Sequence, residues 1–272
     1  MSKVTVREPL RTERLVLRPF AETDLDDVFA YQSIPEVVEF MLWELRSRDE
    51  SREHLARRLP LTSLENDGDI LVLAVALPGE PSLDGSGRDR VIGDLTVFLR
   101  SVANRQAELG WAFHPDFQHR GYASEAAGRM LEFAFTELDS HRVTADLDPR
   151  NHPSAALALR LGMRHEAHFR EDIFTKGAFA DTAIYAILRS EWKARRAGAG
   201  AGASAEAGAS AAAGASTEAG ASAEAGASAA AGASAEAGAS AAAGVSAEAD
   251  AGAGADSEAD DPHGTGSAVH GG

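Results

Sequence analysis

The chain has 272 residues, with 26 Lys and Arg against 42 Asp and Glu, no Cys, and a formal net charge of -16 at pH 7. The absence of Cys excludes disulfides, thiolate nucleophiles and zinc-thiolate centres. The acidic balance argues against general nucleic-acid binding, because phosphate contacts need clustered Lys and Arg. It suits a cationic partner, or simply a soluble surface.

Composition divides the chain into two parts. Residues 197–272 contain no Lys, Arg or aromatic residue but ten Asp and Glu, and residues 201–248 form eight six-residue units close to Ala-Gly-Ala-Ser-Ala-Glu or Ala-Gly-Ala-Ser-Ala-Ala. A helix and silk-like stacking are alternatives, but each Gly costs a helix about 1 kcal/mol and the regular Glu opposes stacking. We predict one folded domain over residues 1–196 and a disordered low-complexity tail over 197–272.

The sequence contains no evident targeting or membrane segment. The first eight residues lack an apolar stretch, and the longest apolar run, Ile70 to Leu77, is far shorter than the roughly 20 residues that cross a bilayer. We therefore expect a cytoplasmic protein without membrane contact.

Hydrophobic periodicity predicts strands and helices that alternate along the domain. In the first half we expect a strand at 14–19, helices from Thr23 through Phe29, at 35–42 and from Asp49 to about Leu64, and strands at 70–77 and 91–99. In the second half we expect a strand at 108–113, a helix at 121–138, a strand at 142–147, a helix at 154–161 and strands around 165–174 and 182–188. This order predicts a mixed α/β sheet.

One stretch, Gln118-His-Arg-Gly-Tyr-Ala123, follows a strand and opens directly into a helix. At such a junction unpaired N–H groups and the positive end of the helix dipole face one point, which can hold a diphosphate without a metal or a Lys. Gly121 and Ala123 would let the main chain approach the ligand closely. By itself the pattern is also typical of an ordinary strand-to-helix turn.

This loop resembles the pyrophosphate-binding Gln/Arg-x-x-Gly-x-Gly/Ala signature of the GNAT superfamily of acyl-CoA-dependent N-acyltransferases, and the resemblance extends over residues 10–193. Residues 10–19 resemble the first strand of the ribosomal-protein-alanine acetyltransferase (RimJ/RimL) branch. Asn151-His-Pro-Ser154 with Leu161-Gly162-Met163 is similar to its Asn-x-x-Ser and Leu-Gly-Phe elements, and residues 181–192 are similar to its ending. The tail has no counterpart in the family.

The resemblance implies the GNAT fold, a central, mostly antiparallel sheet that is splayed between two parallel strands, here 108–113 and 142–147, and flanked by helices. Acetyl-CoA would lie in the split and act as the co-substrate. The implied coenzyme contacts are the main chain of Trp111, Ala112 and Phe113, the diphosphate loop Gln118, His119, Arg120, Gly121, Tyr122 and Ala123, and Asn151 and Ser154.

The implied reaction is direct attack of an amine on the thioester, which requires no protein nucleophile. Ser154 would protonate the departing thiolate, because the Tyr that some branches use four residues later is Ala158 here. Glu108 is the candidate general base. Its rivals are Asp146, Asp148, Glu171, Asp172 and Asp181. The alternatives are a first-turn serine for Ser154, a turn residue for Asn151 and a solvated strand carboxylate for Glu108.

These inferences predict an acetyl-CoA-dependent N-acetyltransferase for a primary amine, with a protein N-terminal α-amine as the acceptor. A small-molecule amine, aminoglycoside-like or polyamine, is the alternative acceptor, and a non-catalytic acyl-CoA-binding module is the alternative class. No metal is expected, because His114, His119, His141 and His152 have no ligand-like spacing. The oligomeric state stays open, with a homodimer among the candidates.

Overall fold

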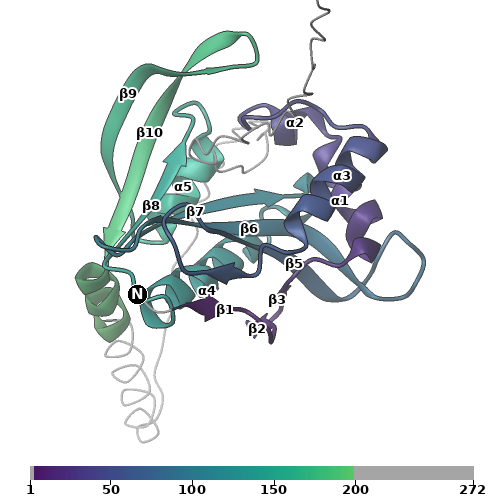
Figure 1. Ribbon diagram of the computed structural model, residues 1–272, viewed down its shortest axis with the longest axis horizontal. Helices are drawn as coiled ribbons and strands as arrows, with labels where there is room; N and C mark the ends of the chain where they lie inside the picture. Colours follow the sequence, from purple (N-terminus) through teal and green to yellow (C-terminus); the bar gives the residue numbers. More distant parts are fainter. Residues whose placement is uncertain (1–2, 199–272) are drawn as a thin grey trace, which may run out of the picture.

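The folded part of the chain is built around one large sheet. The computed structural model describes residues 3–198, and Figure 1 shows the sheet with helices packed around it. Residues 199–272, nearly all of the predicted tail, lie outside the described residues, and so does the disorder predicted for them. Within residues 3–198, no helix combines the length and apolar character that crossing a membrane requires.

The large sheet has eight strands in the order β2-β3-β5-β6-β7-β8-β10-β9, and β1 and β4 form a separate pair. All neighbouring strands are antiparallel except β7 and β8, which are parallel. The strands are β1 (Val4–Thr5), β2 (Leu10–Arg11), β3 (Val16–Arg18), β4 (Ser63–Leu64), β5 (Ile70–Pro81), β6 (Asp89–Ser101), β7 (Gln106–Phe113), β8 (Arg142–Leu147), β9 (Arg164–Thr175) and β10 (Ala178–Leu188). The predicted fold class is confirmed.

Helices cover both faces of the sheet, which explains why the first eight residues of β5, Ile70 to Leu77, are all apolar. Leu71 and Leu73 belong to the core on one face, whereas Val72 and Ala74 belong to the core on the other. Successive side chains of a strand point to opposite faces, so a strand covered on both faces reads as a continuous apolar run. The first face carries α4 (Tyr122–Thr136) and α5 (His152–Arg160), and the second carries α1 (Leu25–Gln32), α2 (Pro35–Val38) and α3 (Arg48–Arg58).

The helix predicted from Asp49 to Leu64 is shorter than expected. Helix α3 ends at Arg58. Leu64 is fully buried and lies in β4, which pairs with β1. Pro60 has no N–H to continue the helical hydrogen bonds, so the chain turns there. The prediction was wrong for residues 59–64 because the buried Leu64 matched a helical spacing.

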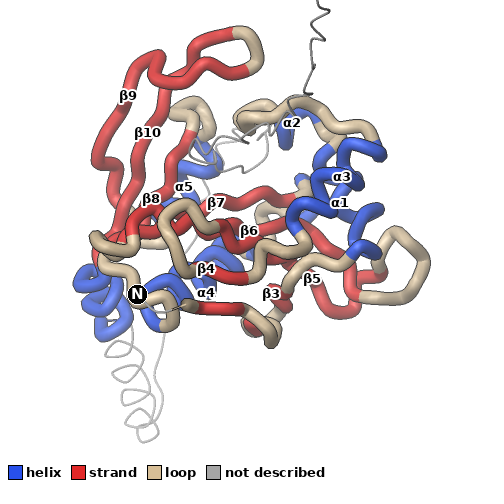
Figure 2. The backbone as a smooth tube through the Cα atoms, viewed as in Figure 1, coloured by secondary structure: helices blue, strands red, loops and turns tan. Residues whose placement is uncertain are grey.

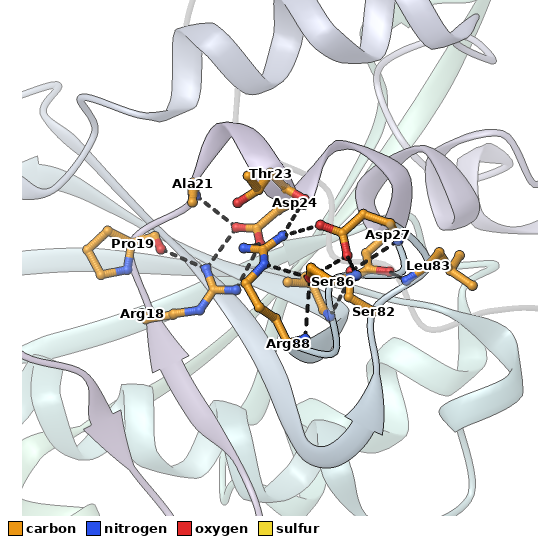
Figure 3. Close-up of polar contacts among 12 residues, drawn as sticks. Arg18, Pro19, Ala21, Thr23, Asp24, Asp27, Ser82, Leu83, Ser86 and Arg88 are labelled. Carbon is orange, nitrogen blue, oxygen red and sulfur yellow. Dashed lines mark hydrogen bonds and ion pairs between the residues drawn. The ribbon is translucent and has the colours of Figure 1, made fainter.

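Two buried carboxylates join the start of α1 to neighbouring strands, Asp27 to the β5–β6 hairpin and Asp24 to β3 (Figure 3). Asp27, only 1% exposed, accepts hydrogen bonds from the main-chain N–H groups of Leu83 at 2.9 Å and Val91 at 3.0 Å. Asp24 accepts two hydrogen bonds from the guanidinium of Arg18, at 2.7 and 2.8 Å. These bonds replace the water that the carboxylates lose on burial.

We predict that Asp27→Ala lowers the free energy of unfolding by about 2–3 kcal/mol, because the buried N–H group of Val91 and the partly buried N–H group of Leu83 lose their acceptor. Urea unfolding measures the change. The matched control is Asp49→Ala, since the Asp49 side chain is 85% exposed and pairs with Arg52; it should cost less than about 1 kcal/mol. Equal losses in the two variants would show that the buried hydrogen bonds of Asp27 do not stabilise the fold.

The β9–β10 hairpin reaches beyond the other strands, toward the chain that follows α2 (Figure 2). At its turn, the ammonium of Lys176 donates to the carbonyl oxygens of Val38 and Glu39, and the Thr175 hydroxyl donates to that of Leu42 at 3.5 Å. The Val38 carbonyl also accepts from the Met41 N–H at 3.0 Å, so the Lys176 ammonium adds a second hydrogen bond to a carbonyl at the end of α2. The hairpin and the segment after α2 are thereby held together.

Candidate active site

The loop between β7 and α4 has the geometry of an anion-binding site. Gly121 is the N-cap of α4 with φ +82°, and the first helical hydrogen bond runs from the Glu125 N–H to the Gly121 carbonyl at 3.0 Å. The N–H groups of residues 122–124 therefore precede the first intrahelical donor and have no helical acceptor. They point at the space in front of the helix, where the helix dipole favours negative charge.

The three side chains before Gly121 differ in how far they are exposed to solvent. His119, with φ +58°, and Arg120 are exposed, and the Arg120 guanidinium lies 5.7 Å from the centre of the Phe117 ring. The amide nitrogen Nε2 of Gln118 is buried and has no hydrogen-bond partner within residues 3–198. A buried donor without an acceptor is costly, so Gln118 is suited to donate to a bound ligand.

Arg14 supports this loop from β3's side of the sheet, and the sequence analysis assigned it no role. Its Nη1 donates to the Arg120 carbonyl at 3.0 Å, and its guanidinium pairs with Glu125 at 2.7 Å and lies 4.6 Å from the centre of the Tyr122 ring. The contacts join residues more than 100 positions apart, so no local pattern could reveal them. Arg14 fixes the loop, and the Glu125 carboxylate balances its charge.

Strands β7 and β8 separate shortly after they begin. Their parallel partners are Gln106 with Arg142, Ala107 with Val143 and Glu108 with Thr144. Beyond these pairs, among the described residues, 109–113 pair only with β6 and 145–147 only with β10. The β7 edge that faces β8 thus leaves main-chain donors and acceptors unpaired. Trp111, Ala112 and Phe113 are each at most 2% exposed as whole residues, so a ligand would have to enter between the strands to reach their main chain.

Asn151 and Ser154 form the start of α5, behind this opening. Asn151 is the N-cap, and its side-chain oxygen accepts from the Ser154 N–H at 3.1 Å. Ser154 is fully buried in the first turn, and its hydroxyl accepts from the indole N–H of Trp111 at 3.3 Å. The two residues therefore have structural roles, and the indole also orients the Ser154 hydroxyl.

Glu108 lies where the strands begin to part, and it is buried. Its side chain is 2% exposed and its Oε2 lies 2.7 Å from Nε of Arg100. It also hydrogen-bonds to Asp146 on β8, and burial together with the charge of Glu108 raises the pKa of Asp146 to about 7. The alternative of a solvated strand carboxylate for Glu108 is wrong, because the neighbouring strands and Arg100 enclose it.

The carboxyl pair and Ser154 lie on opposite faces of the sheet. Leu109 and Trp111 pack in the core beneath α4 and α5, and neighbouring side chains of a strand alternate, so Glu108 points to the other face. Asp146 does the same on β8, where Ala145 and Leu147 pack beneath α4 and α5. A ligand in the opening would have the Ser154 hydroxyl on one side and the carboxyl pair on the other.

A pocket of about 310 Å³ adjoins the carboxyl pair. It lies between residues 39–42, the end of β8 and the β9–β10 hairpin. The helix predicted over 35–42 ends at Val38, so residues 39–42 form a wall of the pocket instead. Its apolar lining includes Phe40, Met41, Leu42, Phe169, Ile173 and Phe179; its acidic lining is Glu39, Asp146, Asp148, Asp172 and Asp181, against the cations Arg150 and Lys176.

The structure separates the rival carboxylates. Asp148 is paired with Arg150 at 2.6 Å. Asp181 accepts from the Glu171 N–H at 2.8 Å and lies 2.7 Å from His168, and these two bonds lower the pKa of Asp181. Glu171 does not line the pocket. Within residues 3–198, no three His, Asp or Glu side chains are grouped so that they could hold a metal ion.

Comparison with known proteins identifies the family. Residues 14–164 match the acetyltransferase (GNAT) domain. The uncharacterized N-acetyltransferase YnaD of Bacillus subtilis is 32% identical over 184 residues, 67% of this chain and 98% of YnaD. Spermidine N(1)-acetyltransferase of Vibrio cholerae is 27% identical over 102 residues, 38% of this chain and 59% of that protein.

A solved structure agrees with the fold. RimL, a ribosomal L7/L12 α-N-protein acetyltransferase in complex with coenzyme A, gives a TM-score of 0.55 at 17% identity, covering 66% of this chain and 98% of that one. At this identity the likeness concerns the fold alone, whereas the domain match covers more than half of the chain. With two parallel strands that part beside a helix-capping loop, this chain belongs to the GNAT family of acyl-CoA-dependent N-acetyltransferases.

Proposed function

We propose that the protein transfers an acetyl group from acetyl-CoA to the α-amine of a protein or peptide N-terminus, as in the RimJ/RimL type. The observation that carries this proposal is the acidic pocket beside the opening between β7 and β8, with Asp146 at the boundary of the two. An acceptor in the pocket would approach a thioester in the opening directly.

The coenzyme would be held mainly by the main chain. The N–H groups of residues 122–124 would take the diphosphate, with Gln118, His119 and Arg120 beside it. The unpaired edge of residues 111–113 would pair with the pantetheine amides, in the manner of an added strand. Glycine at 121 keeps this surface accessible, and Arg14 holds the loop in place.

The acceptor is assigned from the strength of the base that the site offers. A peptide α-amine with a pKa near 8 gives up its proton at pH 7 for about 1.4 kcal/mol, whereas a lysine-like amine with a pKa of about 10.4 costs roughly 4.6 kcal/mol. A carboxyl group such as Asp146, with its pKa raised to about 7, matches the first requirement. RimL, an α-N-protein acetyltransferase, offers a precedent on this fold.

A polyamine is the second candidate, because the acidic lining of the pocket suits a cationic amine of this kind as well. Five carboxylates face the pocket against two cations, which would attract an acceptor with several positive charges. The match to the spermidine acetyltransferase supports the same alternative.

The test is thiol release from acetyl-CoA with a panel of amines at pH 7. The panel contains a peptide with a free N-terminus, the same peptide with a blocked N-terminus and a free Lys, and spermidine. The proposal expects the first to have the highest kcat/KM. Preference for spermidine would replace it with the polyamine assignment, and tight CoA binding without turnover on any amine would indicate a binding module.

We predict that Ser154→Ala lowers kcat about 10- to 100-fold, because the departing thiolate loses a proton donor, while the affinity for CoA changes little. Initial rates and calorimetric titration with CoA measure the two effects. Ser51→Ala is the matched control, since Ser51 is equally buried but lies on α3. If neither rate nor affinity moves in the Ser154 variant, the hydroxyl has only a structural role.

A further inference from the structure

Glu108 and Asp146 differ in how accessible they are from the pocket. Both side chains point to the face of the sheet that carries the pocket, but only Asp146 lines it. Glu108 is 1% exposed as a residue, and Arg100 binds one of its carboxylate oxygens at 2.7 Å. An amine in the pocket can therefore reach Asp146 without any rearrangement, whereas Glu108 lies behind it.

We propose that Asp146 accepts the proton of the attacking amine, and that Glu108, held by Arg100, is a positioning residue that orients and tunes Asp146. This inference rests on the proposed amine acetylation. As the amine nitrogen bonds to the thioester carbonyl carbon, its N–H proton passes to an Asp146 oxygen. The carbonyl electron pair moves to its oxygen and re-forms the C=O bond as the C–S bond breaks, and the thiolate takes the Ser154 hydroxyl proton to leave as CoA thiol, after which Ser154 regains a proton from solvent. The proton on Asp146 returns to solvent.

Charged groups on several strands surround Asp146 and change its pKa. Burial and the charges of Glu108 on β7 and Asp172 on β9 raise its pKa, to about 7, whereas Arg100 on β6 lowers it. Three further charged groups line the same pocket: Asp181, Glu39 and Lys176. Asp148 and Arg150 neutralise each other. Because the raised pKa lies near neutral pH, a substantial fraction of Asp146 is ionised and can take a proton there.

The test is the pH profile of kcat/KM at saturating acetyl-CoA, calculated on the concentration of neutral amine at each pH so that protonation of the substrate does not contribute, for the amine of the panel that the wild-type enzyme acetylates best. The wild-type rate should fall on the acid side with an apparent pKa near 7, as Asp146 becomes protonated. Asp146→Asn should lower the rate about 100-fold or more at every pH and abolish this limb. Its CoA affinity should be unchanged, which also establishes that the variant is folded.

The Glu108→Gln variant separates the two carboxylates. Removing the negative neighbour lowers the pKa of Asp146, so the acid limb should move to lower pH by about one unit while much of the rate at pH 8 remains. Arg100→Gln should move the limb the opposite way. Near-complete loss at every pH in Glu108→Gln, with a preserved limb in Asp146→Asn, would instead make Glu108 the base. The amine panel tests the acceptor and the pH profiles test the base, so each proposal can fail without the other.

Discussion

Gly121→Val should raise the KM for acetyl-CoA about 100-fold, which corresponds to about 2.8 kcal/mol of lost binding. Gly121 has φ +82°, a conformation that a β-branched residue adopts only with strain. A Cβ would also stand 3.3 Å from Nη2 of Arg14, so the side chain that holds the loop would have to move. The branched methyl groups would extend into the space where the unpaired N–H groups converge.

Initial-rate kinetics and calorimetric titration with CoA measure this effect, and Gly85→Val is the matched control. Gly85 has a similar φ of +73°, but a Cβ there meets nothing within 4 Å. It should cost stability through backbone strain and leave the KM unchanged. If Gly121→Val also leaves the KM unchanged, the loop does not bind the coenzyme.

The second large effect is expected at Asp94, which lies in a buried network on the face of the sheet that carries α1 and α3. Its carboxylate accepts from the Tyr31 hydroxyl at 2.5 Å and from Arg58 at 2.6 Å, and its side chain is 6% exposed. Asp94→Ala should lower the free energy of unfolding by about 3–5 kcal/mol, because the nearly buried guanidinium of Arg58 would be left without its counter-charge.

Urea unfolding at pH 7 measures the loss. Tyr31→Phe is the comparison, since it removes one hydrogen bond and leaves the ion pair intact, and should cost about 1–2 kcal/mol. A similar, small loss in both variants would show that Arg58 reaches water when Asp94 is absent. Asp94 pairs with Ala112 on β7, so the affinity for CoA of the folded Asp94→Ala variant should also be measured.

Sequence patterns predicted the helices and strands whose signals come from residues close together in the sequence. The run from Ile70 and the helix after Gly121 carry the periodicities of a buried strand and an amphipathic helix, and both are observed. The two-residue strands β1 and β4 are too short for any periodicity. Their pairing depends on the burial of Leu64 against the rest of the core.

The candidate site divides in the same way. The residues from Gln118 to Ala123 are contiguous, so their loop could be predicted before its shape was known. Arg14 and Arg100 act on residues of other strands or helices, and only folding brings them there. The pocket joins the segment after α2 to the β9–β10 hairpin, and nothing in either stretch alone indicates the other.

The Lys176 ammonium binds the carbonyls of Val38 and Glu39 at the end of α2, and this contact affects how the choice of acceptor amine can change. The loop proposed to bind the coenzyme is one continuous stretch of chain, whereas the wall of the proposed acceptor pocket is assembled from two distant stretches bridged by this contact. Exchanging the hairpin turn for that of a relative could thus redirect which amines are acetylated while leaving the donor half untouched. A chain cut at the turn would still hold CoA but would lose its discrimination among acceptors.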